Sequence, residues 1–130
     1  MPRISPTKAE FDALDALNTI TELGNGWYSQ PLQDGRVHVW KEYEALNKNS
    51  SAWGSIQEIQ ITGLNDWPFG FTATPEHWAN VLYSQHPVMS VEYSGSTATK
   101  HCAVYLTSPV ARTGWSASIV IHAIGTPAAS

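Results

Sequence analysis

The sequence predicts a mainly β protein: an antiparallel β-sandwich of jelly-roll type, preceded by a short N-terminal α-helix. Five short β-rich stretches, separated by Gly, Pro, Asn and Ser, cover residues 36–45, 55–62, 87–94, 100–107 and 115–124. Such spacing is typical of sandwiches and jelly rolls. An Asp-Gly pair that marks a hairpin and a capping box near the N-terminus complete the evidence. The expected domains are a helical neck over 1–24, a sandwich head over 25–125 and a flexible tail over 126–130.

The N-terminal helix is predicted from about Lys8 to Leu23. The sequence TKAE at residues 7–10 matches a capping box, in which a hydroxyl and a carboxylate satisfy amide donors at a helix start. Four apolar residues follow a 3-4-3 spacing: Ala13, Ala16, Ile20 and Leu23. That spacing fits either a short coiled-coil seam or a helix packed on its own domain. Gly24-Asn25-Gly26 is expected to end the helix, because these residues accept left-handed conformations.

The stretch GWYSQPLQDGRVHVWKEYE, residues 26–44, predicts two antiparallel strands joined by a tight primed turn at Asp34-Gly35. Side chains alternate along a strand, so the second strand has two different faces. The inward face is predicted to carry Val37, Val39, Lys41, Tyr43 and Ala45, and the outward face Arg36, His38, Trp40, Glu42 and Glu44. Trp40 on the polar face either packs beneath a neighbouring subunit or loop, or stands exposed for binding.

A second short helix is predicted within TPEHWANVLYSQ, residues 74–85. Thr74 can cap it, and Pro75 suits the first helical position. Trp78, Val81 and Leu82 would share one face.

In the last β stretch, both alternating faces are partly apolar. One face holds Ala117, Ile119, Ile121 and Ala123, and the other includes Val120 and Ile124. Both faces of this strand are therefore expected to be covered.

Composition narrows the classes of function. The 130 residues are 42% hydrophobic and 14% charged, with a formal net charge of -4 and no basic cluster, so we expect no binding to nucleic acid. The low surface charge suits subunit contacts or neutral ligands. No apolar run approaches the ~20 residues of a membrane span, and the N-terminus lacks a signal-peptide core. We therefore expect a soluble, unprocessed chain with no membrane insertion.

No sequence motif predicts a catalytic centre, a metal site or a cofactor. The single cysteine, Cys102, lies in a strand-like run and is expected to be a small buried hydrophobe. The five histidines show neither a helical HExxH nor a strand HxH spacing. Six carboxylates of the β region could pair as in a glycosidase, although solvated faces also explain them: Glu42, Glu44, Glu58, Asp66, Glu76 and Glu92.

The order of several short motifs resembles the C-terminal receptor-binding head domains of siphophage and prophage tail-fibre or baseplate proteins. These motifs are Trp27-Tyr28 before Asp34-Gly35, a strand containing Trp40, the PFGF segment at residues 68–71, and Pro87-Val88 at a strand start. The resemblance covers about residues 8–125. The chain departs from the family pattern between Phe71 and Pro87, where the family has only a few residues.

This resemblance implies a homotrimer in a virion tail, made in the host cytoplasm, that docks onto a saccharide or protein of a bacterial surface. The first hypothesis is a noncatalytic adhesion domain without cofactor. Aromatic faces would lie against sugar C–H surfaces, and polar groups would bond the sugar hydroxyls. The expected ligand-binding residues are Trp53, Glu76, His77, Trp78 and Tyr83. The alternatives are a carbohydrate-active hydrolase with two carboxylates, and a structural domain that only drives trimerisation.

Overall fold

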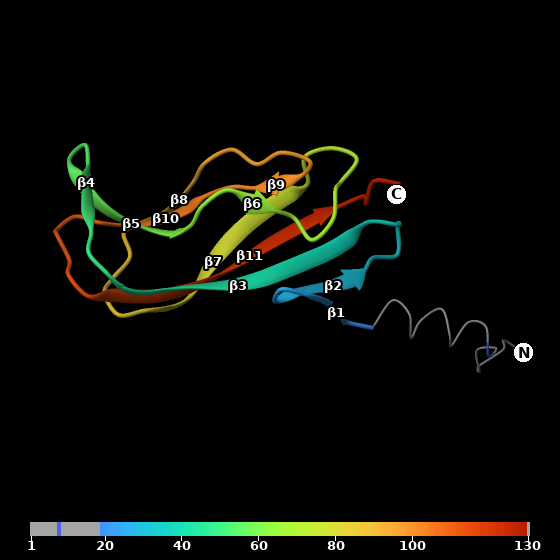
Figure 1. The fold of residues 1–130 in the computed structure, drawn as a ribbon, viewed down its shortest axis with the longest axis horizontal. Helices are drawn as coiled ribbons and strands as arrows, with labels where there is room; N and C mark the ends of the chain where they lie inside the picture. The colour runs from blue at the N-terminus through green and yellow to red at the C-terminus, as the bar shows by residue number, and fades with distance from the viewer. Residues whose placement is uncertain (1–7, 9–18, 130) are drawn as a thin grey trace, which may run out of the picture.

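The computed structural model describes residue 8 and residues 19–129, which form an antiparallel β protein of two packed layers (Figure 1). The strands are β1 (Thr21–Gly24), β2 (Trp27–Pro31), β3 (Val37–Lys48), β4 (Ser51–Trp53), β5 (Ile56–Thr62), β6 (Asn65–Asp66), β7 (Glu76–Ser84), β8 (Ser90–Tyr93), β9 (Lys100–His101), β10 (Val104–Ser108) and β11 (Trp115–Gly125). One sheet has the order β1-β2-β3-β11-β7, and the other has the order β4-β5-β10-β8. A short β6-β9 pair lies at one end. The predicted antiparallel, mainly β fold, consistent with a β-sandwich, is confirmed.

The predicted faces of β3 are confirmed by burial. Val39 and Ala45 are buried and Tyr43 is half-buried, whereas Glu42 and Glu44 on the opposite face are exposed. Side chains of both sheets meet in one core: Trp27, Val39, Ala45, Ile59, Ile61, Trp67, Phe71, Cys102, Val104, Leu106, Trp115, Ala117, Ile119, Ile121 and Ala123. One of the two apolar faces noted for residues 115–124, that of Ala117, Ile119, Ile121 and Ala123, lies in this core. Cys102 is also buried as predicted, and burial raises the pKa of its thiol.

The hairpin at Asp34-Gly35 exists, but the predicted turn type is wrong. The amide of Gly35 donates to the carbonyl of Leu32 at 3.2 Å, and the amide of Leu32 donates to the carbonyl of Arg36 at 2.8 Å. Gly35 has φ +88°, and Asp34 is not in the left-handed region. This pattern is a type I turn followed by a left-handed glycine, the usual three-residue hairpin connection. Asp34 instead accepts hydrogen bonds from the backbone and guanidinium of Arg36.

The predicted N-terminal helix lies mainly outside the described residues, but its expected end at Leu23 is wrong. Thr21–Gly24 forms β1, which pairs with β2. Asn25 has φ +54° and Gly26 has φ +85°. The left-handed residues expected to stop a helix therefore make the turn of a hairpin, and the sheet begins before residue 24.

The second predicted helix, residues 74–85, is also wrong, because Glu76–Ser84 is the edge strand β7. It pairs with β11 from the Glu76↔Ile124 partners to the Ser84↔Ala117 partners. His77, Ala79 and Val81 are half-buried and alternate with exposed residues. Backbone pairing along β11 outweighs the local helical pattern, because that edge of β11 would otherwise keep unsatisfied amides and carbonyls.

The residues expected to be a flexible tail are anchored instead. The amide of Thr72 donates to the carbonyl of Thr126, and the amide of Ala128 donates to the carbonyl of Gly70, both at 2.9 Å. Phe71 forms a β-bridge with Pro127. Residues 126–129 are thus tied to the PFGF segment, which crosses the end of the sandwich.

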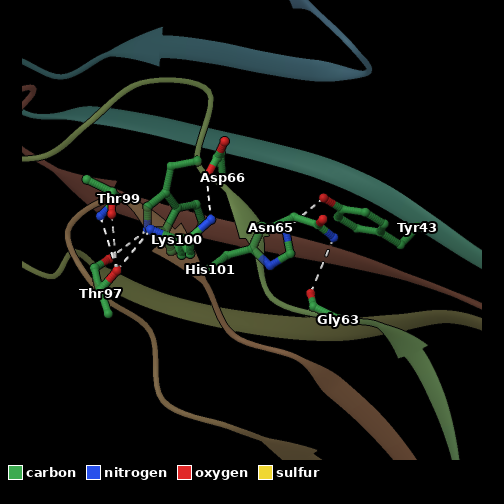
Figure 2. Close-up of polar contacts among 9 residues, drawn as sticks. Tyr43, Gly63, Asn65, Asp66, Thr97, Thr99, Lys100 and His101 are labelled. Atoms are coloured by element: carbon green, nitrogen blue, oxygen red, sulfur yellow. Dashed lines mark hydrogen bonds and ion pairs between the residues drawn. The ribbon is translucent and has the colours of Figure 1, made fainter.

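An aromatic cluster around His101 fills the core near the β6-β9 pair, and Figure 2 shows the hydrogen bond between His101 and Tyr43 within it. Trp67, Trp27 and Tyr43 have ring centroids 5.5, 6.0 and 5.3 Å from that of His101. Nδ1 of His101 lies 2.8 Å from the carbonyl of Cys102, which can only accept, so Nδ1 donates. In the neutral ring, Nε2 then accepts from the Tyr43 hydroxyl at 2.8 Å.

Burial sets the protonation of this pair. It lowers the pKa of His101, with a smaller opposing effect of the Cys102 carbonyl, and it raises the pKa of Tyr43 to about 12. Both side chains are therefore neutral near pH 7. In Figure 2, the exposed Lys100–Asp66 ion pair, 2.9 Å long, closes the same end of the fold.

Gly35→Val is expected to reduce the free energy of unfolding by roughly 1 kcal/mol or more, because a β-branched residue resists positive φ. A Cβ at Gly35 would meet no atom within 4 Å, so backbone strain alone acts. Gly95→Val is the matched control, since its Cβ position is equally open and its φ lies outside the left-handed region. Urea unfolding of both variants measures the difference. Equal losses of unfolding free energy in the two variants would show that the positive φ at Gly35 does not make the substitution there more costly.

Acidification from pH 7.5 to 5 is expected to destabilise the fold partly through His101. Because the folded-state pKa lies below the usual 6.5, the stability contribution is complete above pH 6.5. It is lost as the pH falls towards the folded pKa, at up to roughly 1.4 kcal/mol per pH unit. The variant His101→Gln should be less stable at pH 7.5 yet lose less on acidification. Parallel stability profiles of the two proteins would contradict this assignment.

Candidate functional site

A hollow of about 230 Å³ opens on the four-stranded sheet, and three aromatic rings and two carboxylates line it. Its lining residues are Trp53, Glu58, Glu92, Tyr93, Ser94 and Tyr105. Concave surfaces that combine aromatic rings with a few convergent polar groups are typical ligand sites. We refer to these six residues as the Trp53 hollow.

Strand register brings these residues together from four strands. Tyr105 on β10 lies directly opposite Glu92 on β8. Glu58 on β5 lies opposite Thr107, two residues further along β10 on the same face. Residues two apart in a strand point to the same side, so Tyr105 lies on the same face as the two carboxylates, on the strand between theirs. The order β5-β10-β8 therefore creates the site.

Trp53 forms a wall of the hollow from the β4-β5 hairpin. This hairpin projects at one end of the molecule, away from the C-terminus (Figure 1). Ser50 anchors its base: the Ser50 hydroxyl donates to Gln57 at 3.1 Å and accepts from the amide of Arg112 at 2.8 Å. The Trp53 side chain is 54% exposed, and no aromatic partner contacts it among residues 19–129. The faces of its indole ring are therefore free of other rings.

Two hydroxyls of the hollow have different roles. The Tyr93 hydroxyl accepts from the amide of Ala79 at 3.2 Å and donates to the Ala79 carbonyl at 3.1 Å. These two bonds link β8 to the free edge of β7. Because the Tyr93 hydroxyl is occupied, Tyr93 lines the hollow with its ring. The Tyr105 hydroxyl has no hydrogen-bond partner within the described part of the chain, so it can bond a ligand.

A second hollow of about 370 Å³ adjoins the first. It lies along β5 beyond the short strand β4, and Glu58 lines both hollows. Polar groups dominate the second one: Lys48, Asn49, Ser51, Gln60 and Thr62. A ligand longer than the Trp53 hollow could continue along this polar strip.

A different aromatic surface covers the outer face of the five-stranded sheet. Register places Tyr28, Trp40, His122 and Trp78 side by side on β2, β3, β11 and β7. Tyr28 and Trp40 have ring centroids 6.0 Å apart, and Trp78 and His122 have centroids 4.9 Å apart with planes at 5°. With His38, these residues form what we call the aromatic row. Trp40 thus packs on its neighbours in the sheet, and the row as a whole stays partly exposed.

A chain of hydrogen bonds orders the two histidines of the row. His122 Nε2 donates to Oδ1 of Asn80 at 2.8 Å. Its Nδ1 then accepts from Nε2 of His38 at 3.0 Å when both rings are neutral. Burial lowers the pKa of His38 and His122, and the charge of His38 lowers that of His122 further.

Each ring of the aromatic row already contacts another ring: Tyr28 stacks on Trp40, and Trp78 stacks on His122 and His38. A sugar needs an open ring face for its C–H surface, and Trp53 provides one. The row is better suited to contact another protein surface.

The structure does not bring the five residues predicted as a ligand site into one cluster. Trp53 lines its hollow, whereas Glu76, His77, Trp78 and Tyr83 lie on β7. His77 packs against Trp67 with centroids 6.3 Å apart, and its Nδ1 donates to the Pro75 carbonyl. Trp78 belongs to the aromatic row, and Glu76 and Tyr83 are exposed.

Sequence reasoning missed Tyr105, and it named Glu58 and Glu92 only among six carboxylates that could pair, without bringing them together with Trp53. Alternation within residues 56–62 and 104–108 does place Glu58 and Tyr105 on outward faces. Nothing local in the sequence indicates that β10 lies between β5 and β8.

Residue 8 and residues 19–129 contain no group of three His, Cys, Asp or Glu side chains that could hold a metal ion. In the same residues, no helix has the length and apolar character needed to cross a membrane. No protein-family model matches the chain, and comparison with curated proteins and with solved structures finds no significant match.

Proposed function

We propose that this chain is a noncatalytic glycan-binding domain and that the saccharide binds in the Trp53 hollow. The observation that carries the proposal is the open indole face of Trp53 beside unpaired carboxylates and a free phenol hydroxyl. A sugar ring has an apolar C–H face and a polar rim. The C–H face stacks on an aromatic ring, and the hydroxyls of the rim form hydrogen bonds with groups such as Glu58, Glu92 and Tyr105.

The size of the hollow suggests recognition of a small part of a saccharide. Its volume of about 230 Å³ is below the roughly 300 Å³ at which pockets for drug-sized ligands begin. The adjoining polar strip can hold further sugar units through Lys48, Asn49 and Gln60.

The biological setting that we propose follows the resemblance to phage and prophage tail proteins. The domain would act as a homotrimer in a virion tail and bind a saccharide or protein of a bacterial surface. The partly exposed aromatic row supports a subunit contact, because large exposed apolar patches are uncommon on monomers.

A hydrolase is the second candidate, because Glu58 and Glu92 line one hollow. They lie on strands separated by β10, so their strand axes are roughly 10 Å apart. Incubation with host polysaccharide distinguishes the two functions. Saturable binding without turnover supports an adhesin, whereas released reducing ends identify a hydrolase.

Trp53→Ala is expected to weaken binding to immobilised bacterial polysaccharide at least tenfold, which corresponds to about 1.4 kcal/mol. The melting temperature should change little, since the side chain is more than half exposed. Tyr83→Ala is the matched control, because Tyr83 is 56% exposed and lies outside the hollow. Surface plasmon resonance measures binding, and calorimetry measures melting. Weakened binding in Tyr83→Ala with full binding in Trp53→Ala would place the site on β7.

The homotrimer predicts a sedimenting mass near three times 14.2 kDa. Trp40→Ser combined with Trp78→Ser should shift the protein towards monomer, because both rings lie in the aromatic row. Trp53→Ser is the control for loss of an exposed indole. Sedimentation of the unaltered chain as a monomer at micromolar concentration would remove the trimer from the proposal.

A further inference from the structure

We infer that the Trp53 hollow selects a ligand with a cationic substituent, such as an ammonium group on a saccharide. The inference rests on the proposed function, and it names the chemical class that this site prefers. It follows from how two carboxylates and three aromatic rings are arranged around the same small space.

The carboxylates of the hollow lack a positive partner. Neither Glu58 nor Glu92 takes part in an ion pair within the described part of the chain, where Arg36 pairs with Asp34 and Lys100 pairs with Asp66. Glu92 accepts one hydrogen bond, from the Ser90 hydroxyl at 3.0 Å. Glu58 accepts none from the described part of the chain. A bound cation would compensate both negative charges.

The rings strengthen the same preference. An organic cation over the face of Trp or Tyr is attracted by the ring quadrupole within about 6 Å of the centroid. Tyr105 stands between the two carboxylates, and Trp53 and Tyr93 line the same space. A cation on Tyr105 would therefore meet ring faces and carboxylates together, whereas a neutral group would gain only the ring contact.

A bare metal ion fits this arrangement poorly. Calcium needs six to eight oxygen ligands at about 2.3 to 2.6 Å. Glu58 and Glu92 lie on strands roughly two strand spacings, or about 10 Å, apart with a phenol between them. An ammonium group is larger, tolerates longer contacts and can use the ring faces, so it matches the hollow better.

One positive side chain, that of Lys48, lines the adjoining polar strip together with Glu58. It forms no ion pair with Glu58, and it does not line the Trp53 hollow. Its charge opposes a bound cation weakly through solvent. Replacement by a neutral residue should therefore tighten cation binding slightly.

The test compares choline with its neutral isostere 3,3-dimethylbutan-1-ol at pH 7.5, because the charge of choline does not depend on pH. The Kd values are obtained from NMR shifts of the Trp53 indole and the Tyr105 ring. Choline is expected to bind at least tenfold more tightly, and its affinity should fall as the salt concentration rises. Equal affinities, or tighter binding of the neutral alcohol, would overturn the inference.

Variants locate the effect. Glu58→Gln combined with Glu92→Gln should remove most of the preference for choline, whereas Lys48→Gln should preserve or increase it. Glu42→Gln combined with Glu44→Gln is the control, because it removes two exposed carboxylates from the other sheet. An unchanged preference in the Glu58 and Glu92 double variant would overturn the inference. If the preference for choline fails this test but neutral polysaccharide still binds in a Trp53-dependent way, the proposed function stands without the inference. If neutral polysaccharide does not bind either, the proposed function and the inference are both wrong.

Discussion

The antiparallel pairing of β3 with β11 is the contact on which the rest of the structure depends. It runs from the Val37↔Gly125 partners to the Trp115↔Lys48 partners, nearly the full length of both strands. Its inner face supplies the buried centre of the core, including Val39, Ile119 and Ile121. Its outer face carries the middle of the aromatic row. A slip of one residue would exchange these two faces, so register at this pair determines both surfaces.

The Trp53 hollow depends on that core indirectly. Leu106 and Val104 of β10 are fully buried against the large sheet, so Tyr105 between them must point outward. Tyr93 then links β8 to the backbone of β7, which joins one side of the hollow to the large sheet. Only the β4-β5 hairpin, which carries Trp53, projects beyond this support. Glu58 lies where this hairpin pairs with β10, and the exposed indole of Trp53 lies nearer the tip of the hairpin.

Alternation correctly predicts the strand at residues 36–45 and its buried face, because it reports which side of a strand meets the core. Alternation does not predict the structure of segments that pair with backbone groups far away in the sequence. Residues 76–84 have a helical pattern around Trp78, but the open edge of β11 makes them a strand. Residues 126–129 look like a tail, yet their amides and carbonyls bond the PFGF segment. The grouping of residues in the Trp53 hollow has the same origin: Glu58, Tyr105 and Glu92 come together through a strand order that no local pattern contains.

The core cluster, the aromatic row and Trp53 differ in whether their rings already contact other rings. In the core cluster, Trp27, Trp67 and Tyr43 meet His101 in tilted or edge-to-face contacts. In the aromatic row, Tyr28 stacks on Trp40 and Trp78 stacks on His122 across neighbouring strands. Trp53 has no ring neighbour in the described residues, and it borders unpaired carboxylates. A ring already stacked must lose one contact to make another, whereas an exposed ring exchanges only water. Ligand recognition is therefore favoured at Trp53, even though most aromatic residues of this chain lie elsewhere.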